Sequence, residues 1–313
     1  MLCARLPPAH DAAPSRSPPS SICSMQFLAA LILIAVWSTT ALAINWSVQG
    51  LAYPAALFGR FSLAAVVALA LMFALYRKRL PGGAAWRAYL TAGLGTSLSM
   101  LCTYWASRHV SSGLVAVLFG LIPLSTALFA RLWLDEKLAR HELVGIGLGV
   151  AGLVVVFGER LSLAPDGLPA LLVLLLAVAL QSGAAVRLKP YGQGLPALAV
   201  NAGALLVCAV VTGMLWLAHG APPPWEAPPR TLGAVVYLAL VGSVLAFSLY
   251  YWLIRECRPG QVAVLSLLSP ASALWLGHAL NDETVTGRMM AGTALILAGL
   301  VLHQRHTLRH WRG

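Results

Sequence analysis

Charged residues are scarce in this chain of 313 residues, since only 10% are charged and 59% are hydrophobic. Acids are the rarest, with 10 Asp and Glu against 21 Lys and Arg, and the charges cluster between long apolar runs. A soluble domain cannot bury so many uninterrupted apolar runs of about 18 to 24 residues, so the composition predicts a polytopic helical membrane protein. The runs lack the period-two alternation of transmembrane strands, which excludes a barrel.

Patterns for metals, disulfides and nucleotides are also missing. The 5 cysteines are scattered, so we expect no disulfide framework. His141-Glu142 lacks the second histidine that a zinc-binding helix needs, and Gly93-Leu94-Gly95 lies in an apolar run rather than between a strand and a helix. The net charge of +11 is not gathered on a soluble face, so no nucleic-acid partner is expected. We therefore expect no cofactor, no bound metal and no catalytic residue.

Ten apolar runs are separated by loop-forming residues, and we interpret each as a membrane-spanning helix. The runs are residues 27–46, 51–76, 88–107, 110–130, 143–158, 168–186, 196–218, 231–254, 260–280 and 289–303. The connections at 47–50 and 108–109 are so short that each is either a loop or a kink within a longer helix. Residues 1–24 are rich in Pro and Ser and are expected to be a disordered tail, while residues 304–313 form a basic tail.

Residues 95–154 and 242–301 resemble each other at a constant offset of 147 residues, which indicates an internal duplication. Tyr104-Trp105 recurs as Tyr251-Trp252, and the stretch 115–118 recurs letter for letter as 262–265. The two repeats are expected to occupy residues 25–158 and 166–303, with five spans each. Because five is odd, the second repeat enters the membrane from the opposite side, which makes the repeat inverted.

Basic residues set the expected orientation. Placing both termini in the cytoplasm puts most Lys and Arg on that side, including Arg77, Arg131, Arg187 and Lys189, and leaves few on the other. The sequence therefore predicts a multi-pass protein of the inner membrane with both termini cytoplasmic.

Arg60 is the strongest single candidate for function. It lies several turns inside the second run, where a guanidinium is costly unless it faces water, a partner charge or an anionic ligand. The alternative is a side chain that extends to a nearby membrane surface.

Other polar and aromatic side chains within the runs are further candidates for lining a substrate cavity. Interhelical hydrogen bonding and aromatic belts at the membrane surface are their structural alternatives. These candidates are Trp37, Asn45, Tyr104, Gln181, Asn201, Tyr251 and Trp252.

Gating candidates occur at matching places in the two repeats. Pro123 and Pro270 each free a backbone carbonyl within a run, as a hinge or as a fixed bend. Glu136 and Glu283 end matching runs, where an acid either locks a gate by pairing with loop cations or has a structural role. Small residues in the last run of each repeat predict close helix contact. They are Gly145, Gly149, Gly152, Gly292 and Gly299.

Together these features resemble the EamA family of the drug/metabolite transporter superfamily, over residues 27–303. The resemblance rests on the two five-span repeats, Trp37, Arg60 after Pro54, the segment 113–118 leading to Pro123, and the segment 134–138 followed by Gly145 and Gly152. It implies a bacterial inner-membrane carrier, often an exporter of amino acids or other small metabolites, with a central cavity between the halves. The second repeat has no intramembrane Arg matching Arg60, so an asymmetric site is expected.

The sequence thus predicts a ten-helix secondary transporter of small metabolites that works by alternating access. Coupling to protons and the oligomeric state are left open. The alternatives are a channel, which favours a symmetric ring of polar residues, and a membrane-embedded enzyme, which needs a cluster of ionisable groups that the runs do not supply.

Overall fold

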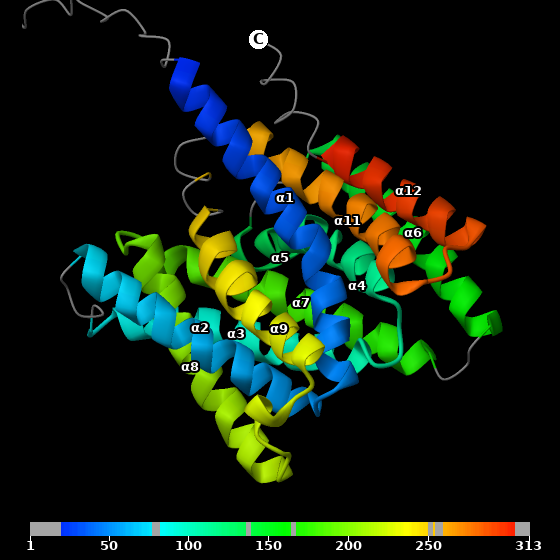
Figure 1. Ribbon diagram of the computed structural model, residues 1–313. Helices are drawn as coiled ribbons and strands as arrows, with labels where there is room; N and C mark the ends of the chain where they lie inside the picture. The colour runs from blue at the N-terminus through cyan, green and yellow to red at the C-terminus, as the bar shows by residue number, and fades with distance from the viewer. Residues whose placement is uncertain are drawn as a thin grey trace, which may run out of the picture.

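The structure is a computed structural model that describes residues 20–76, 82–135, 139–163, 167–249, 253 and 259–303. Helices account for nearly all of these residues, and no strand occurs among them (Figure 1). The first half contains α1 (Ser20–Gln49), α2 (Tyr53–Tyr76), α3 (Ala85–Ala106), α4 (Ser112–Phe119), α5 (Ile122–Leu134) and α6 (Arg140–Leu163). The second contains α7 (Gly167–Tyr191), α8 (Ala197–His219), the short η1 (Pro224–Glu226), α9 (Pro229–Tyr237), the π-helical η2 (Leu238–Leu245), α11 (Pro259–Asn281) and α12 (Gly287–His303).

Each of the ten predicted runs overlaps helix, and both short connections are true breaks between helices. The structure departs from the predicted runs most clearly at two places. The first helix begins at Ser20 rather than near residue 27, and the run 110–130 is divided into α4 and α5 by a turn at Gly120-Leu121. Pro123 occupies the first turn of α5, where its missing N–H leaves no hydrogen bond unmade.

Six helical segments of the described chain are long and apolar enough to cross a bilayer. They are Leu28–Gln49, Tyr53–Ala74, Ser112–Leu134, Leu168–Tyr191, Ala197–His219 and Pro229–Leu249, and Gly287–His303 is a shorter apolar helix. Many large apolar side chains lie on the outer surface, such as Val66, Phe73 and Val154. An outward apolar surface of this kind suits a lipid environment, because lipid does not penalise exposed hydrocarbon.

The two largest apolar clusters hold most of the helices together. One is centred on α4, α7 and α11 and includes Leu118, Leu174 and Ile296, while the other joins α2, α8 and η2 through residues such as Phe61 and Leu238. α1 contacts both groups, because it packs on α11 and α4 and also on α9 (Figure 1). The molecule is therefore two helix groups that α1 and α3 bridge, since α3 packs on α7 of one group and on α8 of the other.

Glycines bring α6 and α12 into backbone contact. A Cβ on Gly145 would lie 2.5 Å from the carbonyl oxygen of Gly299, and one on Gly152 would lie 2.5 Å from that of Gly292. Only a residue without a side chain fits at this distance, which confirms the close helix contact predicted for these glycines. Gly149 instead makes room for Leu124 of α5.

Two aspartates end matching helices in the same backbone conformation. Asp135 (φ 52°) follows α5 and Asp282 (φ 50°) follows α11, and they are the only non-glycine residues with positive φ in the part of the chain described here. Aspartate tolerates this left-handed region better than bulkier residues do. They stand 147 residues apart, the offset of the sequence repeat.

Candidate functional site

Arg60 is buried at the centre of a polar network that joins several helices. Only 4% of its surface is exposed. Its Nε donates to Ser243 Oγ at 3.1 Å and its Nη1 donates to Tyr104 Oη at 3.2 Å, while Met100 Sδ lies 4.0 Å from Nη1. The guanidinium also lies 5.3 Å from the centre of the Phe61 ring. The predicted alternative, in which Arg60 reaches a membrane surface, is therefore wrong.

The local conformation of η2 presents Ser243 to Arg60. Ser243 Oγ donates to the carbonyl oxygen of Leu238 at 2.9 Å. Leu238 is five residues earlier, the same separation that backbone hydrogen bonds have in the surrounding π-helix. Its backbone carbonyl accepts from Asn201 Nδ2 of α8 at 3.4 Å. Short π-helical stretches occur frequently at functional sites, and this one lies against the buried cation.

Gly242 of η2 lies near Nη2 of the guanidinium. A Cβ on Gly242 would lie 3.9 Å from Arg60 Nη2 and 3.8 Å from Thr40 Oγ1 of α1. A side chain at position 242 would therefore begin in van der Waals contact with Nη2 and with the Thr40 hydroxyl. The network takes residues from α2 and α3 of the first half and from α8 and η2 of the second.

No negative charge balances Arg60 within the described residues. Its hydrogen bonds go to neutral acceptors, and no described carboxylate forms an ion pair with it. A buried cation with neutral partners is costly, because those partners replace only part of its hydration. A guanidinium in this state retains a strong affinity for a carboxylate, which it can bind through two parallel N–H donors.

Three predicted cavity residues, Arg60, Tyr104 and Asn201, thus meet in one network, whereas others lie elsewhere. Asn45 Nδ2 donates to the carbonyl oxygen of Ser107 at 3.1 Å, which fastens α1 to the end of α3. Trp37 is partly buried in a cluster that includes Leu33 and Leu253. Tyr251 and Trp252 lie outside the described residues.

Gln181 on α7 remains a separate polar candidate. Its Oε1 is buried and accepts no hydrogen bond among the described residues. An unpartnered amide oxygen inside a membrane helix bundle costs free energy, so this atom is available to a bound water or a ligand.

Glu283 binds the first turn of α4 rather than loop cations. Its Oε1 accepts from Ser112 N at 2.9 Å and its Oε2 accepts from Gly113 N at 3.0 Å, so the carboxylate fills the N-terminus of that helix. Asn281 Nδ2 donates to Oε1 at 3.0 Å, and Trp46 Nε1 of α1 donates to Asn281 Oδ1 at 3.1 Å. The matching acid Glu136 lies outside the described residues.

The two prolines proposed as kinks have different settings. Pro123 follows the break between α4 and α5, whereas Pro270 lies inside α11. A Cβ on Gly120, at that break, would lie 2.9 Å from Pro270 Cγ. The α4–α5 break therefore packs directly on Pro270.

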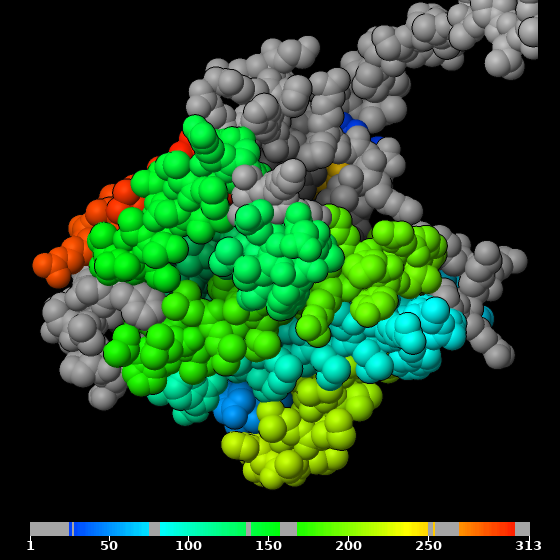
Figure 2. Space-filling model, turned by 180° about the vertical axis from the view of Figure 1, so that it is seen from behind, coloured from blue at the N-terminus to red at the C-terminus, as the bar shows by residue number. Residues whose placement is uncertain are grey.

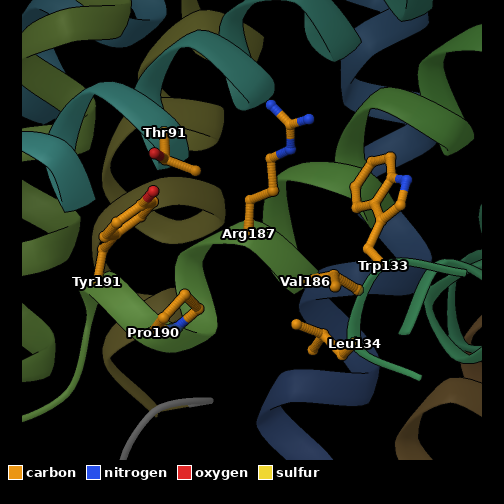
Figure 3. A pocket seen from close by; sticks show the side chains of 7 residues that line it. All are labelled: Thr91, Trp133, Leu134, Val186, Arg187, Pro190 and Tyr191. Carbon is orange, nitrogen blue, oxygen red and sulfur yellow. The ribbon is translucent and has the colours of Figure 1, made fainter. Parts of the chain in front are cut away.

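A pocket opens beside the C-terminal ends of α5 and α7 (Figure 3). Its volume is about 390 Å³, and α3, α5 and α7 line it. Its lining residues are Thr91, Trp133, Leu134, Val186, Arg187, Pro190 and Tyr191. None of these residues was a sequence candidate.

Ser243, Met100 and Gly242 of the Arg60 network were also missed from the sequence. A single serine in an apolar run is typical of helix packing, and a methionine there is typical of core. One signal was available, because Gly242-Ser243 stands where the first repeat has Gly95-Thr96, a small residue followed by a hydroxyl in both.

Comparison with known proteins gives consistent matches along the chain. The EamA-like transporter family matches residues 24–158 and again residues 168–303. The inner membrane transporter YedA of Escherichia coli, itself uncharacterized, is 29% identical over 286 residues, which cover 88% of this chain and 89% of YedA. A crystal structure 23% identical, with a TM-score of 0.65, covers 91% of this chain and 98% of its own and shows the same fold.

Two further relatives have named substrates. The S-adenosylmethionine/S-adenosylhomocysteine transporter of Chlamydia trachomatis is 26% identical over 301 residues, which cover 90% of each chain. A probable amino-acid metabolite efflux pump of Salmonella typhimurium is 26% identical over 289 residues, covering 88% of this chain and 93% of the pump.

Proposed function

This chain belongs to the EamA-like transporter family, and we propose that it exports small metabolites that carry a carboxylate, such as amino acids or their derivatives, across the inner membrane. The observation that carries the proposal is Arg60, a buried cation with neutral partners at the contact between the two halves. Both relatives with named substrates act on amino acids or derivatives of them, and these compounds carry a carboxylate.

Helix contacts support ten spans arranged as two related halves. The spans α1, α2, α3, α4–α5 and α6 correspond in order to α7, α8, α9–η2, α11 and α12. With this correspondence, the contact of α1 with α11 matches the contact of α7 with α5. Likewise, the contact of α3 with α8 matches the contact of η2 with α2. Exchanging the two halves therefore converts one contact of each matched pair into the other, as expected for an inverted repeat. We place both termini in the cytoplasm, because the basic residues gather at that end.

Transport would proceed by alternating access around Arg60. The guanidinium holds the substrate carboxylate, and the hydroxyls of Tyr104 and Ser243, which accept hydrogen bonds from the guanidinium, lie beside it. Because both halves contribute to this network, movement of one half against the other changes which end of the bundle it faces.

Purified protein in liposomes is expected to take up amino acids and their derivatives but not the corresponding methyl esters or amines, which lack the carboxylate. Initial uptake rates of labelled compounds, with and without an imposed pH gradient, check this and report any proton coupling. Uptake equal to that of protein-free liposomes for every acid, or equal rates for acids and esters, would contradict the proposed substrate class. A flux that does not saturate would favour the channel alternative.

Glu283 is suited to act as a latch at the external end. It joins the loop between α11 and α12 to the first turn of α4, which belongs to the other half. Gly277 makes this possible, since a Cβ there would lie 2.5 Å from Glu283 Oε2. Trp46 extends the contact to α1, and Arg230 of α9 lies 4.4 Å above the Trp46 ring. Opening at this end requires these contacts to part.

Removing the carboxylate is expected to expose the start of α4. Ser112 is 1% exposed and its Oγ has no partner among the described residues, so Ser112→Cys is a mild probe of opening. With Glu283→Ala added, labelling of this cysteine by a membrane-impermeant maleimide should accelerate at least about tenfold, because two hydrogen bonds to a charged group are each worth about 1.5–3 kcal/mol. Glu226→Ala, which removes an exposed acid of η1, is the control. Equal labelling rates for Ser112→Cys alone, with Glu283→Ala and with Glu226→Ala would show that Glu283 is not a latch.

A further inference from the structure

The pocket between α3, α5 and α7 combines one fixed cation with two hydroxyls. Arg187 lies 4.9 Å above the Trp133 ring, and Trp133 lies against Phe129 with ring centres 4.7 Å apart. A Cβ on Gly183 would lie 3.0 Å from Trp133 Cη2, so the indole rests directly on α7. The hydroxyl of Tyr191 points toward that of Thr91 across the pocket (Figure 3). Aromatic packing, rather than a carboxylate, holds Arg187 in place among the described residues.

The surroundings of the pocket are apolar and face outward. Leu134, Val186 and Pro190 complete its lining. Trp133, Leu134 and Tyr191 are each more than two-fifths exposed, so the pocket lies on the outer surface of the bundle rather than inside it. Seen from behind, α5 and α7 form part of the molecular surface (Figure 2). Exposed leucines adjoin the pocket on α3 and α5, at Leu90, Leu94 and Leu132.

Further basic residues surround the opening. Arg87 stands one turn before Thr91 on α3, Arg131 lies in the last turn of α5, and Lys189 lies in the last turn of α7. The ends of α5 and α7 carry partial negative charge, which these cations more than offset. Aromatic residues with basic neighbours at helix ends are typical of the level of the lipid headgroups.

We propose that this pocket binds the headgroup of an anionic phospholipid of the cytoplasmic leaflet, with its phosphate on Arg187 and its acyl chains along the exposed leucines. A phosphate accepts hydrogen bonds from a guanidinium and from hydroxyls at once, which matches Arg187, Thr91 and Tyr191. The apolar part of the lining would make no favourable contact with a soluble anion, but it can pack against the glycerol and first methylenes of a lipid. Basic pockets between helices on the cytoplasmic side bind lipid headgroups in this way.

The test compares phosphatidylglycerol with phosphatidylcholine on full-length protein in detergent. Phosphatidylglycerol, and not phosphatidylcholine, should raise the melting temperature and remain bound in native mass spectra. Arg187→Gln should weaken the apparent lipid affinity roughly fivefold, the effect expected for one basic side chain near a lipid surface. Arg108→Gln removes an exposed cation outside this pocket and should leave the affinity unchanged.

Three outcomes would overturn the proposal. The first is equal binding of both lipids, and the second is unchanged phosphatidylglycerol binding by Arg187→Gln. The third is stabilisation by inorganic phosphate at millimolar concentration that matches the lipid effect, which would assign the pocket to a soluble phosphate compound. Because no transport is measured, the result does not depend on which substrate the protein carries.

Discussion

Replacing Arg60 with alanine is expected to lower the initial uptake rate of a carboxylate substrate at least about 30-fold. Removing one partner from a buried, hydrogen-bonded charge pair costs about 2–5 kcal/mol, and every 1.4 kcal/mol is a factor of ten. Folding should be largely preserved, because the substitution removes a costly buried cation whose partners among the described residues are all neutral. The measurement is uptake into liposomes at matched protein content, with melting temperature as the check on folding.

Two further variants separate charge from packing at this site. Arg60→Lys keeps the positive charge but loses the planar fork, so it should restore only part of the rate. Arg108→Ala removes an exposed cation outside the network and should transport at the wild-type rate. Wild-type uptake by Arg60→Ala, with the protein folded, would remove Arg60 from the substrate site and leave its burial without a functional reason.

Substituting Gly152 with leucine is expected to destabilise the folded protein more than any surface change on the same helix. The new side chain would begin 2.5 Å from the carbonyl oxygen of Gly292 and 2.9 Å from Ile296 N, so the backbones of α6 and α12 must separate. Overpacking of this kind costs about 1–3 kcal/mol and occasionally more. The readout is the melting temperature of the purified protein, with Gly152→Ala as a milder version if the leucine variant is not recovered.

Gly147 provides the matched control on α6. No atom lies within 4 Å of a Cβ built there, so Gly147→Leu places the same side chain in open space. Leucine has a higher helix propensity than glycine by somewhat less than about 1 kcal/mol, so this variant should be slightly more stable than the wild type. The idea of a backbone contact between α6 and α12 fails if both leucine variants change the melting temperature equally.

The sequence located the helices well because apolar runs and their breakers record which segments avoid water. It did not locate the break between α4 and α5, since Gly120 and Pro123 within one run are equally compatible with a bent helix. The π-helical conformation of η2 could not be predicted from the sequence either. Within it the Ser243 hydroxyl donates to the carbonyl oxygen of Leu238, five residues back, and no residue pattern signals this arrangement.

The site was predicted one residue at a time. Arg60, Tyr104 and Asn201 were each recognisable as costly or unusual within an apolar run, but their meeting depends on how α2, α3 and α8 pack. The partners of Glu283 likewise could not be predicted without knowing how the helices pack. Its matching position in the repeat marked it as a gate candidate, yet its partners are backbone N–H groups of a distant helix, and every helix start offers such groups.

The contact between α6 and α12 bears on how such a chain could have originated. Gly292 and Gly299 are the residues 147 positions after Gly145 and Gly152, so each glycine touches the counterpart of the other. A contact with this reciprocity can form between two identical five-helix chains inserted in opposite orientations. An ancestor half this size would therefore have needed no new surface to pair with itself, and fusion of two gene copies would have preserved the contact between the paired chains.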